Sequence, residues 1–142
     1  MAKRTFKGSC HCGRVKFEAE IDLAQGTSKC NCTSCWKRRW WSARCAPEDF
    51  RPLSGEAELV WYRQGTTTGR GGFCKHCGVK TYVFVEKADW NPTEYVSINV
   101  ATLDNLESDR ARRSADSILR RPQRQLVERP CRSQAPLERR PV

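Results

Sequence analysis

Cysteines stand in three short clusters along this chain: Cys10-His11-Cys12, Cys30-Asn31-Cys32-Thr33-Ser34-Cys35 and Cys74-Lys75-His76-Cys77. Two thiolates separated by one or two residues can bind one metal ion while the chain turns between them. A tetrahedral zinc site takes four such sulfurs, commonly as two pairs from distant segments. The clusters hold seven cysteines, which is not a multiple of four. How the sulfurs divide between sites is therefore the main question that the sequence raises.

Two divisions of the sulfurs fit the spacing. The first and third clusters offer four sulfurs, those of Cys10, Cys12, Cys74 and Cys77. A closed site of four thiolates is structural, because it leaves no position for a substrate. The middle cluster offers three sulfurs, those of Cys30, Cys32 and Cys35. Three ligands leave an open position, as at a catalytic zinc, unless Cys45 completes a second closed site. Spacing alone leaves both divisions open.

Composition indicates one modest domain that depends on cross-links. Of its 142 residues, 38% are hydrophobic and 30% charged, a lean mixture whose stability metal sites would increase. Residues 1–8 contain no apolar region of a signal peptide, and no apolar run approaches the ~20 residues of a membrane span. We therefore expect a cytoplasmic protein, in which clustered cysteines favour metal binding over disulfides. Disulfides remain the alternative on composition alone.

Positive charge is concentrated at the C-terminal end. Residues 109–142 contain ten arginines against four acidic residues, a net charge of +6 out of the total of +10. This segment is poor in apolar residues, has prolines at 122, 130, 136 and 141, and contains the isolated Cys131. We expect a domain over 1–108 and an irregular or weakly helical basic tail over 109–142. A mildly basic domain makes nucleic acid a less favoured partner than the total charge suggests.

Hydrophobic patterning predicts a mainly β fold of short antiparallel strands. Strict alternation over 14–21 and 95–100 indicates half-buried strands, and apolar runs over 58–63 and 79–85 indicate two more. Residues 47–50 begin with proline and are typical of one helical turn, and the glycine-rich run 65–72 is expected to be a loop. No long amphipathic helix is predicted before residue 105.

Several other residues near the clusters could either contribute to a functional site or have only a structural role. His11 and His76 lie inside the chelating turns, where a solvent-facing role is favoured over metal ligation. Trp40 and Trp41 are expected in the core or in a pocket wall. The basic run at residues 37–39 is typical of a solvated surface. Beside an open zinc site, however, that run would suit an anionic substrate.

Four stretches of the chain resemble one known family. They are Gly8-Ser9-Cys10-His11-Cys12-Gly13-Arg14-Val15-Lys16-Phe17, Cys30-Asn31-Cys32-Thr33-Ser34-Cys35-Trp36-Lys37, Phe73-Cys74-Lys75-His76-Cys77-Gly78-Val79 and Val96-Ser97-Ile98-Asn99-Val100-Ala101-Thr102-Leu103-Asp104. Over residues 5–108 the chain resembles the glutathione-dependent formaldehyde-activating enzyme (GFA) family, which includes centromere protein V.

The resemblance implies a β-rich fold with two zinc ions. It implies a structural zinc on Cys10, Cys12, Cys74 and Cys77 and a catalytic zinc on Cys30, Cys32 and Cys35, with no role for Cys45. It further implies a carbon–sulfur lyase that forms S-hydroxymethylglutathione from glutathione and formaldehyde, or reverses that reaction. Charge and closeness to the clusters mark four possible contacts for the glutathione carboxylates: Lys37, Arg38, Arg39 and Arg70.

The tail departs from the family. Relatives end with a stretch resembling Asp-Gly-Arg-Asn-Asp-Asn-Trp-Trp, whereas residues 121–130 read Arg-Pro-Gln-Arg-Gln-Leu-Val-Glu-Arg-Pro. Written in GC-rich codons and read one nucleotide later, this run gives Gly-Arg-Asn-Asp-Asn-Trp-Trp-Ser-Ala. We hypothesise that the tail is a frameshifted form of the family ending, beginning after about Glu107. The nucleotide sequence of the gene tests this hypothesis directly.

Two other functions stay open at this point. A zinc-stapled module that binds nucleic acid or protein is favoured by the basic charge and by Trp36, Trp40 and Trp41. An inactive member of the family is the third reading. If the chain is an enzyme, zinc could act in two ways: it could lower the pKa of a bound thiol, or it could polarise the carbonyl group of the aldehyde. We favour the first role, because three thiolate ligands weaken the Lewis acidity of zinc. The sequence identifies no general base.

Overall fold

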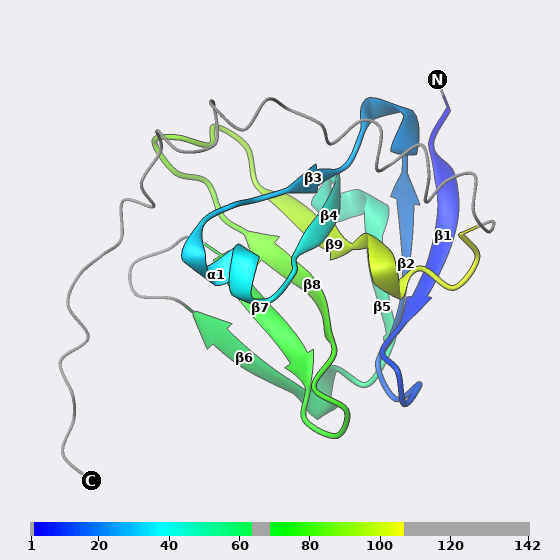
Figure 1. Cartoon of the computed structure of the whole chain (residues 1–142). Helices are drawn as coiled ribbons and strands as arrows, with labels where there is room; N and C mark the ends of the chain where they lie inside the picture. Colours follow the sequence, from blue (N-terminus) through cyan, green and yellow to red (C-terminus); the bar gives the residue numbers. More distant parts are fainter. Residues whose placement is uncertain (1, 64–68, 107–142) are drawn as a thin grey trace, which may run out of the picture.

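A computed structural model describes residues 2–63 and 69–106 of the chain (Figure 1). The strands are β1 (Arg4–Ser9), β2 (Lys16–Ile21), β3 (Ser28–Lys29), β4 (Trp41–Cys45), β5 (Phe50–Ser54), β6 (Leu59–Arg63), β7 (Gly69–Cys74), β8 (Lys80–Val85) and β9 (Tyr95–Asn99). The one α-helix in this part of the chain is α1 (Thr33–Lys37). Short 3-10 helices lie at Leu23–Gln25, Pro47–Asp49, Glu56–Glu58 and Val100–Thr102. The predicted mainly β class is confirmed.

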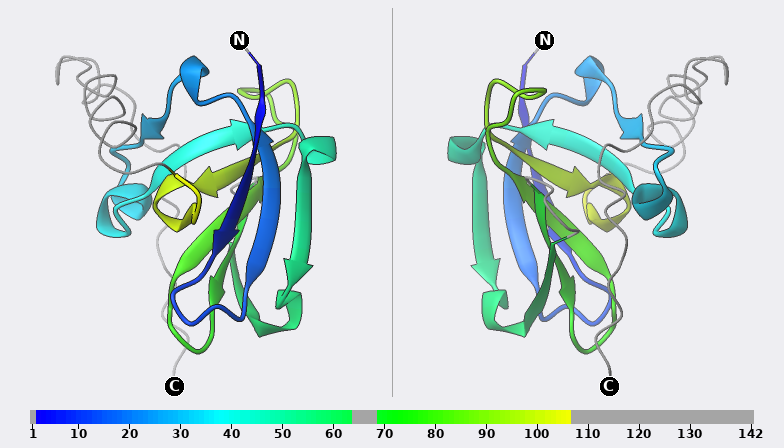
Figure 2. Two further views of the ribbon diagram at one scale, coloured as in Figure 1. Left: turned by 90° about the vertical axis from the view of Figure 1, so that its right-hand side faces the viewer. Right: turned by 90° about the vertical axis from the view of Figure 1, so that its left-hand side faces the viewer.

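The strands form two antiparallel sheets. The smaller sheet has the order β1-β2-β5, and the larger has the order β3-β4-β9-β8-β7-β6. Figure 2 shows β5 at one edge of the molecule and α1 at the opposite edge. The connections β1–β2 and β7–β8 carry the first and third cysteine clusters, so each sheet contributes one of these turns.

Alternation decides which side chains enter the core between the sheets. Val15, Phe17, Ala19 and Ile21 are all buried, while Lys16 between them is exposed. Val96, Ile98 and Val100 are buried in the same way, as their spacing predicts.

An aromatic cluster joins the two sheets across this core. The Tyr82 ring of β8 lies 5.6 Å from Phe17 and 4.6 Å from Phe50, centroid to centroid. Phe50 also meets Phe84 at 5.7 Å in an edge-on arrangement. Aromatic pairs at such distances add to the free energy gained by burying their area. The cluster therefore fixes how the small sheet sits on the large one.

The glycine-rich segment corrects one prediction. Residues 65–72 were expected to form a loop, but Gly69–Cys74 is strand β7, paired with both β6 and β8. Glycine usually weakens a strand, and it is found where another group must approach the backbone closely. Here the ladders on both sides compensate for the low strand propensity. Residues 64–68 lie outside the described part of the chain.

The sequence analysis did not predict strands β1, β3, β4 and β5 or helix α1. The segment that follows β9 pairs with the outer edge of β1. Gly8 is paired with Leu103, and the Asp104 N–H donates to Lys7 O at 2.8 Å. The Lys7 N–H in turn donates to Asn105 Oδ1 at 2.9 Å. The Leu-Asp ending of the family-like stretch thus covers backbone groups of an edge strand.

The predicted domain boundary at residue 108, the tail over 109–142 and Cys131 all lie outside the described residues. They stay predictions, as does the frameshift. Among the described helices, none is both long and apolar enough to cross a membrane.

Gly8 offers a test of the packing between β1 and β2. A Cβ at this position would lie 2.2 Å from Cζ of Phe17, which is fully buried. Gly8→Ala should therefore lower the free energy of unfolding by about 1–3 kcal/mol, as overpacking does. Urea denaturation measures this change. Lys7→Ala, at the exposed neighbouring position, is the control and should change stability by less than about 0.5 kcal/mol. Equal effects of the two substitutions would contradict this packing.

Candidate functional site

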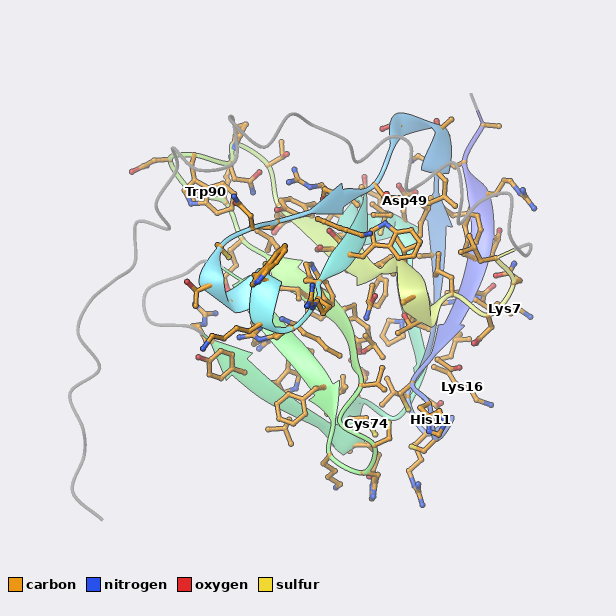
Figure 3. The ribbon with its side chains drawn as sticks, viewed as in Figure 1. Lys7, His11, Lys16, Asp49, Cys74 and Trp90 are labelled. Atoms are coloured by element: carbon orange, nitrogen blue, oxygen red, sulfur yellow. The ribbon has the colours of Figure 1, made fainter. Side chains whose placement is uncertain are left out.

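The first and third clusters meet at one end of the molecule. The Sγ atoms of Cys10, Cys12, Cys74 and Cys77 all lie within 4.8 Å of one another. Figure 3 shows His11 and Cys74 at this end, one from each cluster. Cys10 and Cys74 are buried, whereas Cys12 is exposed. The fold therefore brings together two pairs of thiols, and more than sixty residues of the chain separate one pair from the other.

The two turns that carry these thiols share two backbone features. The Cys10 N–H donates to Val15 O, and the Cys74 N–H donates to Val79 O, each at 3.0 Å. Each turn contains a glycine with positive φ, Gly13 at +76° and Gly78 at +75°. Only glycine adopts this conformation without steric cost, so these residues let the chain reverse around its sulfurs.

The spacing of the sulfurs fits a tetrahedral zinc ion. With a Zn–S bond of about 2.3 Å, two sulfurs of a tetrahedron stand about 3.8 Å apart. The Sγ atoms of Cys12 lie 3.5 Å from Cys10 and 3.7 Å from Cys74. Hydrogen bonds from Arg14 lower the pKa of Cys12 to about 6, which favours the thiolate that a metal requires. These four residues could hold a structural metal ion.

The middle cluster forms a second group of sulfurs around the start of α1. The Sγ atoms of Cys30, Cys32 and Cys35 lie within 4.8 Å of one another. Cys32 is the N-cap of the helix, and its sulfur accepts the Cys35 N–H at 3.5 Å. The Cys32 N–H donates to the Cys30 sulfur at 3.4 Å. The helical turn thus points all three sulfurs at one place.

The pKa shifts of these thiols favour the binding of a cation. A hydrogen bond from the Cys35 thiol lowers the pKa of Cys30 to about 5. The same bond, together with burial, raises the pKa of Cys35. The three sulfurs therefore share protons, and a metal ion would replace them. The group is accessible, since Cys30 is exposed and the other two are half-buried.

No fourth ligand from the described part of the chain joins these three sulfurs. Cys45, the alternative fourth ligand, lies on β4, where it pairs with Val96 and is buried in the core. Burial raises the pKa of its thiol to about 12, which disfavours the thiolate. His11 is exposed, and His76 contacts Glu58. The arrangement therefore leaves an open position.

A cavity of about 320 Å³ adjoins the three sulfurs. Cys30 and Cys35 line it on one side. Three cations also line it: Arg38 at the end of α1, Arg44 of β4 and Lys80 of β8. Arg38 stacks on Tyr62 at 4.8 Å, and Arg44 stacks on Tyr95 at 4.4 Å, which holds both guanidinium groups at the walls. Among the described residues, no Asp or Glu lines this cavity.

A second cavity of about 580 Å³ adjoins the first. The two share four lining residues, namely Arg38, Tyr62, Gly71 and Lys80. A larger cavity of about 810 Å³ lies on the other side of Arg44 and Tyr95. That cavity holds neither sulfur group and mixes acidic with basic side chains. The chemistry therefore points to the smaller pair of cavities.

Residues 5–119 match the family described as glutathione-dependent formaldehyde-activating enzyme. This chain belongs to the GFA family. The sequence resemblance is thereby confirmed, and the match runs beyond the described residues. The fold is also similar to a crystal structure of a Rhodobacter sphaeroides protein, with a TM-score of 0.62 and 34% sequence identity. The similarity covers 72% of this chain and 91% of that one.

The sulfurs that the GFA resemblance assigns to two zinc ions are the same two groups that the fold brings together. The predicted glutathione contacts are more scattered. Arg38 lines the cavity, whereas Lys37 and Arg39 are exposed and absent from its lining. The Arg70 guanidinium stacks on Trp61 at 4.7 Å, and strand alternation places it on the face opposite Gly69 and Gly71.

Sequence reasoning missed Arg44 and Lys80. The two residues belong to strands that are distant from one another in sequence, and only the order β4-β9-β8 brings them to one cavity. Lys80 follows Cys77 by three residues, and that closeness to a cluster was its only signal.

Single cysteine substitutions should separate the two sulfur groups. We expect each group to hold one zinc ion, so Cys74→Ala should lose one of them and lower the melting temperature strongly, because the four-sulfur group links the two sheets. Cys32→Ala should remove the other zinc with a smaller loss of stability. Cys45→Ala, outside both groups, is the control and should keep both ions. Metal analysis combined with thermal denaturation measures these effects. Loss of a zinc ion in Cys45→Ala would contradict the division.

Proposed function

We propose that this chain catalyses the addition of a thiol such as glutathione to formaldehyde or a related aldehyde, and the reverse cleavage. The product is a hydroxymethyl thioether, so the enzyme is a carbon–sulfur lyase. One observation carries the proposal: three accessible sulfurs with an open position stand at the wall of a cavity lined by cations. Membership of the GFA family supports the same reaction.

The metal-binding residues and the cavity have separate roles in this proposal. Cys30, Cys32 and Cys35 would hold zinc, which would lower the pKa of a bound thiol and so increase its nucleophilic fraction. Cys10, Cys12, Cys74 and Cys77 would hold a second zinc that is structural. The half-enclosed cavity would orient the thiol next to the aldehyde, which removes the entropic cost of bringing them together.

The charge of the cavity suits glutathione. This tripeptide carries two carboxylates, and Arg38 and Arg44 offer planar guanidinium groups that bind carboxylates in a bidentate manner. Because no described acidic residue lines either cavity, the two carboxylates of glutathione meet no repelling side-chain carboxylate there.

The reaction should depend on the three-sulfur group. In the presence of glutathione and formaldehyde, Cys32→Ala should lose the rate enhancement, because it removes one ligand from the open site. Exchange between free and hydroxymethylated glutathione is measured by NMR, with the uncatalysed rate subtracted. Cys45→Ala is the matched control and should exchange at the wild-type rate. Equal rates in Cys32→Ala and the wild type would reject metal-dependent chemistry.

Recognition of carboxylates should depend on Arg38. Arg38→Ala should raise KM for glutathione about 10-fold or more with a smaller effect on kcat, as loss of a charged hydrogen bond does. The same variant should leave the rate with cysteamine, a thiol without carboxylates, unchanged. Arg51→Ala, whose guanidinium pairs with Glu18 on the small sheet, is the control. An equal loss with both thiols would show that Arg38 does not recognise carboxylates.

A second candidate function rests on one exposed pair. The Arg39 guanidinium lies 5.0 Å from the Trp36 ring, and Trp36 is 60% exposed. Stacked arginine and tryptophan are typical of surfaces that bind single-stranded nucleic acid. Affinity for an oligonucleotide that falls steeply with salt and is lost in Trp36→Ala would favour this binding module over the enzyme.

A further inference from the structure

Lys80 lines both of these cavities. It is the first residue of β8 and is partly buried. Its Nζ lies 4.8 Å from the centroid of the Trp40 ring. The Trp40 indole is itself fixed, because its Nε1–H donates to Ser97 Oγ at 3.3 Å. The amine is therefore held beside the three-sulfur group rather than extending into solvent.

Two neighbours give the lysine its place. Asn99 Nδ2 donates to the Lys80 backbone carbonyl at 2.8 Å, which fixes the start of the strand. Gly71 on the adjacent strand leaves room for the side chain, since a Cβ there would lie 2.7 Å from Lys80 Cε and 2.8 Å from Nζ. Glycine at this position is thus explained by the close approach of the amine.

The amine has no carboxylate partner in either cavity, within the residues that the structure describes. From the α1 side it faces Arg38, Cys32 and Cys35. Cys30, Arg44 of β4 and the phenols of Tyr62 and Tyr95 complete the titratable groups of the lining. Burial and then Arg38 lower the pKa of Lys80 to about 8, although the two cysteines act in the opposite direction.

We propose that Lys80 transfers the proton during the addition of thiol to aldehyde, an inference that rests on the proposed function. The neutral amine accepts the S–H proton, and the sulfur lone pair forms the C–S bond. The carbonyl π electrons move to oxygen, and the ammonium returns the proton to that oxygen. No electron is gained or lost overall. In the reverse direction the amine removes the hydroxyl proton while the C–S bond breaks.

Arginine distinguishes proton transfer from a fixed positive charge. Lys80→Arg keeps the charge but does not deprotonate, whereas Lys80→Met removes both functions. With zinc-loaded protein, glutathione and formaldehyde, both variants should lose about 100-fold or more in kcat, the usual contribution of acid–base catalysis. Lys16→Met, an exposed lysine on β2, is the control. Full activity of Lys80→Arg would overturn the proposal and leave only an electrostatic role.

Gly71→Ala provides a milder test of position. The added methyl group displaces the end of a flexible side chain and leaves the lysine itself unchanged. The variant should retain both zinc ions and lose about 10-fold in kcat, since misplacing an acid–base group slows proton transfer. Wild-type kcat in this variant would show that the place of the amine is unimportant.

The pH dependence gives a further result. Catalysis requires the neutral amine to accept a proton, so the enzymatic rate should fall as the pH drops below about 8, with the limb absent in Lys80→Arg. Competitive labelling with acetic anhydride, followed by mass spectrometry, titrates Lys80 without any assay of activity. A midpoint near 8 supports the proposal, and a midpoint at the ordinary value of about 10.4 overturns it.

Stability provides a second measurement that is independent of activity. The folded-state pKa of Lys80 lies below its unfolded value, so the fold is destabilised while both states are charged, below about pH 8. Lys80→Met should therefore melt above the wild type at pH 7, and the difference should shrink as the pH rises toward 10. A constant difference counts against the proposal. A wild-type chain without catalysis rejects the proposed function, whereas an active wild type with an equally active Lys80→Arg rejects proton transfer alone.

Discussion

The meeting of four sulfurs at one point is the constraint on which the remaining structure depends. One pair belongs to the β1–β2 turn of the small sheet and the other to the β7–β8 turn of the large sheet. A metal ion there would cross-link the sheets at one end, while the aromatic cluster around Tyr82 packs them in between. For a chain with a lean apolar content, this link sets the position of the large sheet. Because the hydrogen bond from Cys74 to Val79 closes the turn, it also fixes where β8, and hence Lys80, begins.

The part of the fold that the sequence could predict follows from local rules. Alternating residues such as Val15 and Phe17 identify a buried face without any knowledge of the partner strand. Paired cysteines identify the metal-binding turns in the same way. These local rules could not predict that Cys45 is buried, because sequence spacing does not determine which face of a sheet a side chain occupies. Pairing of β4 with β9 turns it into the core beside Val96.

The cavity illustrates what local patterns leave out. Arg44 and Lys80 come from different strands, and their closeness exists only through the sheet order. The glycine-rich run was interpreted as a loop because strands seldom contain so few side chains. In this sheet the glycines leave space that other groups use. Residues of β7 line a cavity, and the amine of Lys80 lies next to Gly71. The glycines that make room for the cavity therefore made this strand look like a loop in the sequence.

The different burial of the two sulfur groups has a consequence for oxidation. In the four-sulfur group Cys10 and Cys74 are buried, so oxidants reach these two sulfurs slowly, although Cys12 is exposed. Cys30 is exposed, and its low pKa keeps it in the reactive thiolate form when no metal is bound. Two of the three sulfurs could then join as a disulfide while the fold, held at the other end, stays intact. Protein whose three-sulfur group alone has lost its metal and oxidised in air would stay folded yet lose its open site, and it would be mistaken for an inactive relative.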